Sequence, residues 1–504
     1  MRLLPVCLSI LTLFMVNNAF ADYTYREDDT RLVNGILYDV NGEVVTGVYE
    51  EFYDNNVKKS EMPYVEGVLN GVGSLYTEKG IKKADMPFVN GKLDGSVLTY
   101  YENGSMKEKV PYKNGKIHGV VRTYFKNGVV KSRINYDNDV RSGLAKLYYE
   151  NGNLKETYTY VNDEKQGPAV VYFSDGHVAE EYSYVSDVIN GYRKIYYRSG
   201  RLKSEIEYAN GKKNGQMYNY FENGKKEAII PYKNDEVFGE GSFYTEDGLL
   251  NLTVNYANNL RNGIAKAYYP SGNIKLEVNY ANDIKNGVET EYFESGAVKT
   301  KMPYVNGIVE GMGYEYYETS GLKMEMPYVK SVANGMAKFY DEKGKLVSEA
   351  TYVNGKKEGL QKDYNAMGRR VAEGVYKNDI LEGEYKEFFD DGRIKSVANY
   401  EKGNLEGMSL IYDHDGNLAY EVPYVNNRKE GKVKRYYPTG ELMGEVSYEK
   451  GQKHGMLDAY YQDGSLMAKV LFNKNKAIKG YSMDHGENPV LMKKEELAII
   501  NDAY

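Results

Sequence analysis

The sequence predicts an all-β fold, an elongated single-layer antiparallel sheet of tandem β-hairpins that ends in a short helix. Two observations lead to this prediction. A glycine recurs every 24 residues from Gly47 to Gly455, eighteen times without an insertion or deletion, and an aromatic residue follows each of these glycines after five and again after seventeen residues. Such strict periodicity marks a repeat protein, in which each unit is one supersecondary element. We number the positions of a repeat from 0, at the glycine, to 23.

The repeat that covers residues 287–310 shows why the unit is a hairpin. A short β-rich run over 288–293 is followed by the turn residues Glu294-Ser295-Gly296, in which glycine supplies a positive φ. A second run covers 298–304, and Asn306-Gly307 begins the turn into the next repeat. Other repeats have Asn-Asp or Asn-Asn there, residues that tolerate the left-handed conformation. Because both connections are short, successive strands are expected to be antiparallel neighbours.

Alternation along the second run assigns its side chains to faces. Positions 11, 13, 15 and 17 are mostly aliphatic, small, aliphatic and tyrosine, whereas positions 12, 14 and 16 are mostly Lys, Glu, and Pro or Asn. A strand with this period of two has one apolar face and one polar face.

The cross-strand pairing follows if positions 8 and 9 are the two turn residues. Gly287 then faces Tyr304, Phe293 faces Val298, and Tyr292 faces Lys299. A side chain at position 0 would collide with the tyrosine ring opposite, and the tyrosine at position 5 would lie beside a lysine on the polar face, where ring and ammonium can contact. A loop longer by one residue would move every position to the other face, and the sequence leaves this alternative open.

Two rows of residues follow as candidates for a role. A single layer cannot bury both of its faces, so the position-5 row is the candidate binding face. Its central members are Tyr196, Tyr220, Tyr268, Tyr292 and Tyr316. The structural markers are the glycines Gly263, Gly287 and Gly311 with the position-17 tyrosines Tyr280, Tyr304 and Tyr328. Aromatic ladders also stabilise sheets, so a purely structural role for both rows is the alternative.

Residues 1–21 have the pattern of a cleaved signal peptide. Arg2 precedes the apolar stretch 3–16, and Ala19-Phe20-Ala21 supplies small residues before a cut at Asp22. The mature protein is therefore expected to be periplasmic, on the cell surface or secreted. The single cysteine, Cys7, lies inside this segment, so the mature chain has no disulfide and no thiolate metal site.

The rest of the chain divides into a repeat array and two caps. Residues 22–46 are expected to cap the N-terminal end, 47–478 to form the eighteen repeats, and 479–504 to form a C-terminal cap. Within that cap, residues 489–503 have an amphipathic pattern with Pro489 near the start, which predicts a helix.

Charge and motif content argue against several functions. The net charge is −7 with both signs interleaved and no run of Lys and Arg alone, which disfavours nucleic acid and anionic membrane lipid as partners. No catalytic residue, metal site or cofactor is predicted, because the histidines do not fall at ligand spacing and no non-repetitive region of domain size is left for an enzyme. The histidines are His118, His177, His414, His454 and His485.

The repeat resembles the bacterial variant of the MORN repeat, the unit also found in YwqK-family antitoxin proteins. The resemblance is clear at 143–156 (GLAKLYYENGNLKE) and at 352–359 (YVNGKKEG), and it extends over about residues 35–479. It implies hairpins laid side by side in one long twisted sheet, and roles in binding, scaffolding or self-association. The expected function is an exported, non-enzymatic scaffold for a protein or glycan partner; an antitoxin or immunity protein that sequesters a toxin is the alternative.

Overall fold

The computed structural model describes residues 23–485 and 487–503. The predicted signal segment lies outside the described residues. The chain divides into two compact units, Met1–Phe238 with Glu246–Gly248, and Gly239–Thr245 with Leu249–Tyr504. The first contains eight repeats and the second contains ten.

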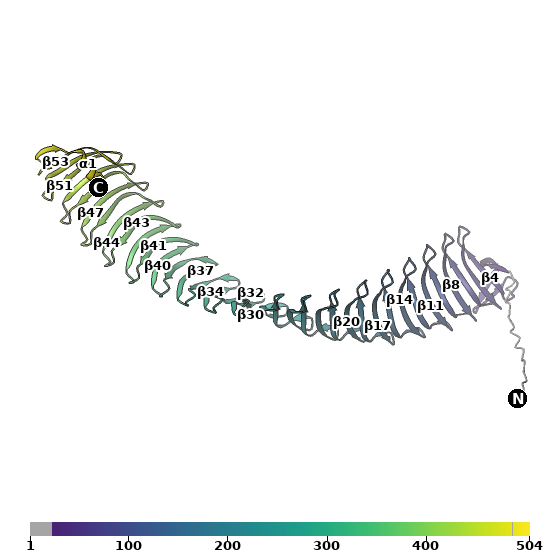
Figure 1. The fold of residues 1–504 in the computed structure, drawn as a ribbon. Helices are drawn as coiled ribbons and strands as arrows, with labels where there is room; N and C mark the ends of the chain where they lie inside the picture. The colour runs from purple at the N-terminus through teal and green to yellow at the C-terminus, as the bar shows by residue number, and fades with distance from the viewer. Residues whose placement is uncertain (1–22, 486, 504) are drawn as a thin grey trace, which may run out of the picture. The chain divides into compact units, whose positions relative to one another are not determined.

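Every repeat forms the same hairpin, and the strands of each unit lie side by side in sequence order (Figure 1). The opening strand runs from position 0 to position 5, the second strand from 11 to 18, and a short third strand covers 21 and 22. In one repeat these are β33 (Gly287–Tyr292), β34 (Val298–Val305) and β35 (Ile308–Val309). The short strand is continuous with the next opening strand in β30 (Leu260–Tyr268), β41 (Lys356–Tyr364), β43 (Ile380–Phe388) and β51 (Gln452–Tyr460). Strand makes up 66% of the chain and helix 2%, which confirms the predicted all-β class.

The turns between repeats have the predicted left-handed backbone. Asn306 and Gly307 have φ values of 49° and 81°, and the Asn-Asp turn at Asn282 and Asp283 has values of 49° and 68°. Two consecutive positive φ values match the twist of antiparallel strands, which is why Asn, Asp and Gly occupy these positions. The turn chemistry therefore fixes the antiparallel order of the strands.

The pairing of position 0 with position 17 is confirmed. Gly287 pairs with Tyr304 across β33 and β34, and Gly263 and Gly311 pair with Tyr280 and Tyr328 in the same way. All these pairs are antiparallel neighbours in one layer of strands.

The pairing near the hairpin tip is not as predicted. Tyr292 pairs with Val298 and not with Lys299. The amide of Phe293 donates to the carbonyl of Ala297 at 2.8 Å, so the tip loop has three residues, one more than predicted. The one-residue shift stops at a β-bulge, where Lys299 has no paired residue on the opposite strand. Beyond the bulge the register is as predicted.

The bulge exchanges the predicted faces of positions 11 and 12. In one repeat, Lys58 at position 11 contacts Glu61 at position 14 (Nζ to Oε2, 2.9 Å), whereas Lys59 at position 12 contacts Glu51 at position 4 (3.4 Å). Position 11 therefore lies with the predicted polar face, and position 12 lies with the apolar one. We call positions 2, 4, 12, 13, 15, 17 and 22 the packed face, and positions 1, 3, 5, 11, 14, 16, 18 and 21 the open face.

The packed face carries the core of each unit. Ala145 and Ala337, both at position 2, have no exposed surface, and Val254 and Val278 at position 15 are buried. Small side chains at position 2 let the larger residues at positions 15 and 17 of neighbouring hairpins close over them. Ala265 at position 2 pairs with Val254 and Val278, and Tyr280 packs against this cluster. Burial in this single layer therefore comes from side chains that cover one another along the sheet.

The N-terminal end has its own small structure. Its elements are β1 (Thr24–Arg26), the 3₁₀ turn η1 (Glu27–Asp29), β2 (Thr30–Val33) and β3 (Ile36–Asp39). β1 pairs in parallel with β4 (Gly47–Phe52), while β2 and β3 form a separate hairpin. Leu37 and Val45 are buried there.

The C-terminal end differs from the prediction in where its helix starts. The chain continues as β53 (Lys476–Asp484) and β54 (Glu487–Leu491), and helix α1 covers Lys494–Ala503. Pro489 lies in β54 and not at a helix start, because an edge strand tolerates a residue without an N–H. The backbone amide of Lys493 donates to the Glu496 carboxylate at 2.6 Å, which satisfies an amide at the actual helix start.

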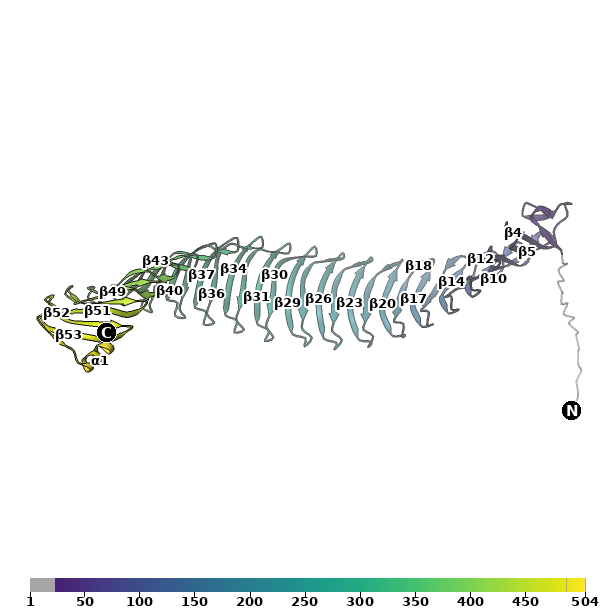
Figure 2. The ribbon, with the colours of Figure 1, turned by 90° about the horizontal axis from the view of Figure 1, so that it is seen from above.

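Helix α1 packs on the packed face of the last hairpins, beside β53 (Figure 2). Gly480 makes this contact possible. A Cβ there would lie 2.7 Å from Sδ of Met492 and 3.0 Å from Cδ2 of Leu497. Within residues 23–485 and 487–503, no helix has the length and apolar content needed to span a membrane.

Candidate functional site

The candidate binding row at position 5 lies on the open face and is half-buried. The hydroxyl of Tyr196 donates to Oε2 of Glu181 at 2.6 Å, and that of Tyr292 donates to Oε2 of Glu277 at 2.8 Å. Burial, followed by these carboxylates, raises the pKa of both tyrosines to about 12. The other candidates, Tyr220, Tyr268 and Tyr316, are half-buried as well. Where the carboxylate of the preceding repeat binds the hydroxyl, the ring is a fixed part of this face.

The lysines at position 12 contact rings at position 6 and not the predicted rings at position 5. A ring at position 5 is contacted instead from position 11, where the ammonium of Lys82 lies 6.0 Å from the ring centroid of Tyr76. The ammonium of Lys155 at position 12 lies 5.8 Å from the centroid of Tyr149, and Lys275 lies 5.7 Å from Tyr269. The bulge causes this difference because it turns position 12 to the packed face. The Tyr149 hydroxyl also donates to the backbone carbonyl of Tyr172 in the next repeat, at 2.7 Å. Sequence reasoning missed this row, although the recurring Tyr-Tyr pairs were a signal for it.

The tyrosines at position 17 lie on the packed face, and cations stack on many of them. The guanidinium of Arg261 lies 4.2 Å from the ring centroid of Tyr280, and the ammonium of Lys285 lies 4.8 Å from that of Tyr304. Each cation is at position 22 of the repeat before its ring. The cations over tyrosines are Arg141, Lys165, Lys213, Arg261, Lys285, Lys357 and Lys429, and Lys453 lies in the same way over Phe472. This row was also missed, and its signal was the recurrence of Lys or Arg at position 22.

The glycine at position 0 is needed for a different reason from the predicted one. Gly287 has a φ of 112°, which L residues with a side chain rarely adopt, and a Cβ there would first meet Asn279 at 3.5 Å. The tyrosine ring opposite is not the obstacle. The Tyr328 ring lies instead over Gly313 at position 2, where a Cβ would be 2.9 Å from Cε2. Backbone conformation therefore explains the periodic glycine, and ring packing explains a small residue at position 2.

One histidine cluster resembles a catalytic arrangement without its geometry. Nδ1 of His485 lies 2.9 Å from Oδ2 of Asp463 and 3.0 Å from Oγ of Ser465. In a Ser-His-Asp triad the serine hydroxyl and the carboxylate contact different nitrogens of the imidazole ring, whereas here both contact Nδ1. The ring stacks on Tyr461 at 4.4 Å, so the cluster closes a hairpin tip. Outside residues 1–22, 486 and 504, no group of three or more His, Cys, Asp or Glu is placed to hold a metal ion.

The open face carries a strip of exposed apolar side chains that the sequence alone did not single out. Val288 at position 1 is 53% exposed, Val305 at position 18 is 50% exposed, and Ile308 at position 21 is 44% exposed. The next hairpins repeat the pattern with Met312, Val329, Val332 and Met336, which are all exposed. We call these seven residues the apolar strip. Its members lie on one face because positions 1, 18 and 21 alternate with packed positions.

Twelve segments of 22 residues each match the family model described as MORN repeat variant. They are residues 45–66, 93–114, 117–138, 141–162, 189–210, 213–234, 261–282, 285–306, 333–354, 381–402, 405–426 and 429–450, more than half of the chain. The chain belongs to the MORN repeat variant family. Each match to this family begins at position 22 of one repeat and ends at position 19 of the following repeat. It therefore contains both long strands of one hairpin.

Solved structures similar to this MORN-repeat chain include the crystal structure of TcdB2-TccC3-Cdc42 and the Photorhabdus luminescens Tc holotoxin pore. The first is 11% identical, is matched over 94% of this chain and 34% of that chain, and has a TM-score of 0.13. The second is 13% identical, is matched over 89% of this chain and 30% of that chain, and has a TM-score of 0.14. The chain thus spans about a third of those proteins, and TM-scores this low carry no argument. No curated protein matches the chain.

Proposed function

We propose that this MORN-repeat chain is an exported, non-enzymatic scaffold that binds a protein partner along its open face. The observation that supports this proposal is the apolar strip, in which residues such as Val288 and Val305 leave half of their surface exposed. Soluble proteins rarely expose contiguous apolar patches of this kind unless the patch is an interaction site. The non-enzymatic part rests on the sequence, which is repetitive throughout residues 47–478.

The composition around the strip favours a protein as the partner. Tyrosine and methionine are enriched at protein interfaces, and Tyr292, Tyr316, Met312 and Met336 all belong to the open face. A toxin sequestered by the chain would belong to this class of partner. A glycan is the second candidate, favoured by the row of tyrosine rings at position 5, because such rings offer an apolar body with a polar end.

Export predicts a defined N-terminus. The mature protein recovered from a bacterial host that secretes it should start at Asp22, because the small residues Ala19 and Ala21 specify the cut. N-terminal sequencing of the exported fraction measures this directly. Ala21→Leu should prevent the cleavage and serves as the control. Exported protein that still begins at Met1 would contradict the proposal.

The strip predicts which substitutions weaken partner binding. We expect Val305→Lys, Met312→Lys and Val329→Lys together to weaken capture of the partner at least about tenfold, since central interface residues each contribute more than about 1 kcal/mol. The partner would be captured by crosslinking to the mature chain in envelope, secreted and host-cell fractions, and its affinity then measured. Folding should be unchanged because these side chains are exposed.

A matched control uses exposed apolar residues outside the strip. Leu249 and Met367 lie at hairpin tips and are 44% and 73% exposed. Changing both to Lys adds positive charge without touching the strip, so binding should stay within about twofold of that of the unchanged protein. Equal loss of binding in the control would show that charge alone causes the effect, and unchanged binding in the strip variant would place the interface elsewhere.

A further inference from the structure

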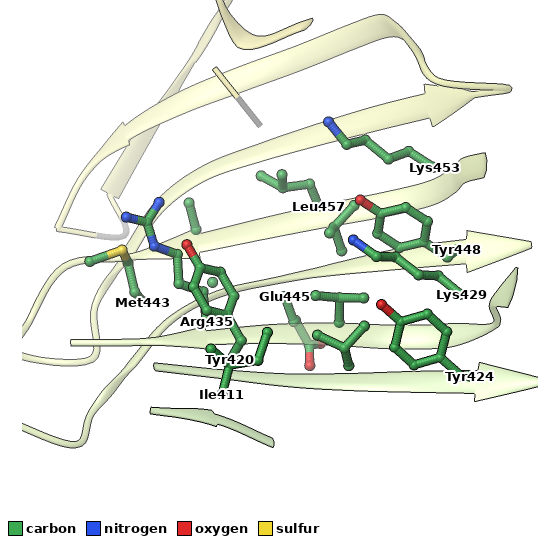
Figure 3. A pocket seen from close by; sticks show the side chains of 15 residues that line it. Ile411, Tyr420, Tyr424, Lys429, Arg435, Met443, Glu445, Tyr448, Lys453 and Leu457 are labelled. Atoms are coloured by element: carbon green, nitrogen blue, oxygen red, sulfur yellow. The ribbon is translucent and has the colours of Figure 1, made fainter. Parts of the chain in front are cut away.

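The packed face of the second unit contains a hollow of about 370 Å³ near the C-terminal end. Figure 3 shows Lys429 and Lys453 extending beside the rings of Tyr424 and Tyr448 at one end of this hollow. Its floor is apolar and includes Val433, Val446, Leu457 and Ala459, all buried. A concave, mostly apolar site with a few polar groups is the usual form of a small-molecule site, and this volume falls in the usual range.

The two lysines lack partners for their charges. The ammonium of Lys429 lies 5.2 Å from the ring centroid of Tyr448, and that of Lys453 lies 5.3 Å from that of Phe472. Within the described part of the chain, neither ammonium makes an ion pair or a hydrogen bond. Lys453 is only 9% exposed, and its burial, with the nearby charge of Lys429, lowers its pKa. An unpaired cation on a largely buried side chain is unfavourable, and ring contacts offset this cost only in part.

Other groups around the hollow do not neutralise this charge. Glu445 also lines it, but its carboxylate is ion-paired with Lys432. Arg435 adds a third cation at the other end, where it lies over the ring of Tyr420 (Figure 3). The hollow therefore combines an apolar floor with excess positive charge.

Three equivalent cations in other repeats have carboxylate acceptors that are missing here. Arg261 is paired with Asp283 at 2.8 Å, and Arg141 is paired with Asp163 at 2.9 Å, in each case with position 20 of the next repeat. Lys285 is paired instead with Glu289, at position 2 of the next repeat.

For Lys429 and Lys453, neither of these two positions carries a carboxylate. In the repeat after Lys429, position 2 is Val433 and position 20 is Gly451. In the repeat after Lys453, position 2 is Leu457 and position 20 is Asn475. The side-chain oxygen of Asn475 accepts from the backbone amide of Lys453. Of these four residues, Val433 and Leu457 belong to the apolar floor of the hollow.

We propose that this hollow binds a small amphiphile, with its anionic headgroup between Lys429 and Lys453 and its apolar tail along Leu457 and Ala459 toward helix α1. The path of the tail follows a second hollow of about 270 Å³ that shares Leu457 and Ala459 with the first. It is lined by apolar residues of the last hairpins and α1, among them Met467, Val470, Met492 and Ile500. A carboxylate and a phosphate monoester share the required headgroup chemistry.

Calorimetric titration of the full mature chain tests the proposal. The ligands are decanoate, decyl phosphate and decanol, each below its micelle-forming or solubility limit. At least one anionic ligand should bind, and the tighter of the two identifies the headgroup. Decanol should bind at least about tenfold more weakly, because it has the tail without the charge.

The variant Lys429→Met with Lys453→Met removes both charges and keeps the length of the side chains. It should weaken binding of the anionic ligand at least about tenfold. Lys213→Met is the matched control, because the Lys213 ammonium also lies over a tyrosine ring, that of Tyr232, at 4.8 Å. If the double variant loses the circular dichroism signal of its strands, the single variant Lys429→Met is titrated in its place, because Lys429 is half-exposed and its change should not affect folding.

Three results would overturn the proposal. They are no binding of either anionic amphiphile, equal binding of decanol, and equal binding by the lysine variant and the unchanged protein. A loss of binding in the Lys213 control would also count against it, because the effect would not then be local. Since the hollow lies on the packed face, the lysine variant should leave partner capture by the open face unchanged, and the two proposals can fail separately.

Discussion

Deleting one complete repeat should leave a folded protein, whereas deleting half of one should break the array. Removal of residues 263–286 joins position 23 of one repeat to position 0 of a later one, so every strand keeps its direction and its partner type. Because each repeat contacts only its neighbouring repeats, the deletion costs the stability of one repeat and of one interface between repeats. We expect the same strand circular dichroism per residue and a thermal midpoint within a few degrees.

Removal of residues 263–274 deletes most of an opening strand, its tip loop and the first residue of the second strand. The strand that follows, β31 (Ile274–Ala281), would then have to lie beside β29 (Leu250–Ala257), to which it runs parallel in the intact chain. A parallel pair needs a crossover of a dozen or more residues, and none is left. We expect unfolding to split into two less cooperative transitions, and limited proteolysis to cut at the junction. Equal cooperativity in both deletions would contradict the hairpin register.

Removing the packed-face rings should destabilise the array more than removing the open-face rings. Changing Tyr280, Tyr304 and Tyr328 to Ser uncovers the aliphatic floor and removes the ring contacts of Arg261 and Lys285. We expect a loss of about 1–2 kcal/mol for each ring, from apolar burial and cation–π contact together. Denaturant unfolding, with hydrogen exchange in residues 263–334, measures the loss.

The matched variant changes Tyr268, Tyr292 and Tyr316 to Ser in the same three repeats. These rings lie on the open face, so we expect a loss of about 1 kcal/mol or less for each, in the range of cross-strand pairs on a sheet surface. Tyr292 should account for the largest part because its hydroxyl binds Glu277. If the open-face set unfolds the repeats and the packed-face set does not, the two faces have been assigned the wrong way round.

Much of the fold could be predicted because its determinants are local. The 24-residue period, the hairpin as the unit, the left-handed Asn-Gly turns and the pairing of Gly287 with Tyr304 all follow from the sequence. Each depends on residues that are close in the chain, or on strict repetition. Glycine and asparagine reveal turn conformation because few other residues adopt a positive φ.

The side to which positions 11 and 12 point was decided by the tertiary structure. A loop of two residues and a loop of three followed by a bulge fit the same sequence, and only hydrogen bonding to the partner strand chooses between them. The choice moved Val298 to the open face and Lys299 to the packed face. The apolar strip, at positions 1, 18 and 21, did not depend on this choice. It became visible from the exposure of its side chains, which depends on the neighbours of each strand.

The sequence by itself determined the repeat, its turns and its antiparallel order, because these rest on backbone preferences within about two dozen residues. The tertiary structure alone decided which charges are left without partners. Lys429 and Lys453 look like any other position-22 cation in the sequence, and their lack of a partner depends on Gly451, Asn475, Val433 and Leu457 in the next repeats. Electrostatic pairing between repeats is a property of distance in space, and that distance is set when the hairpins stack.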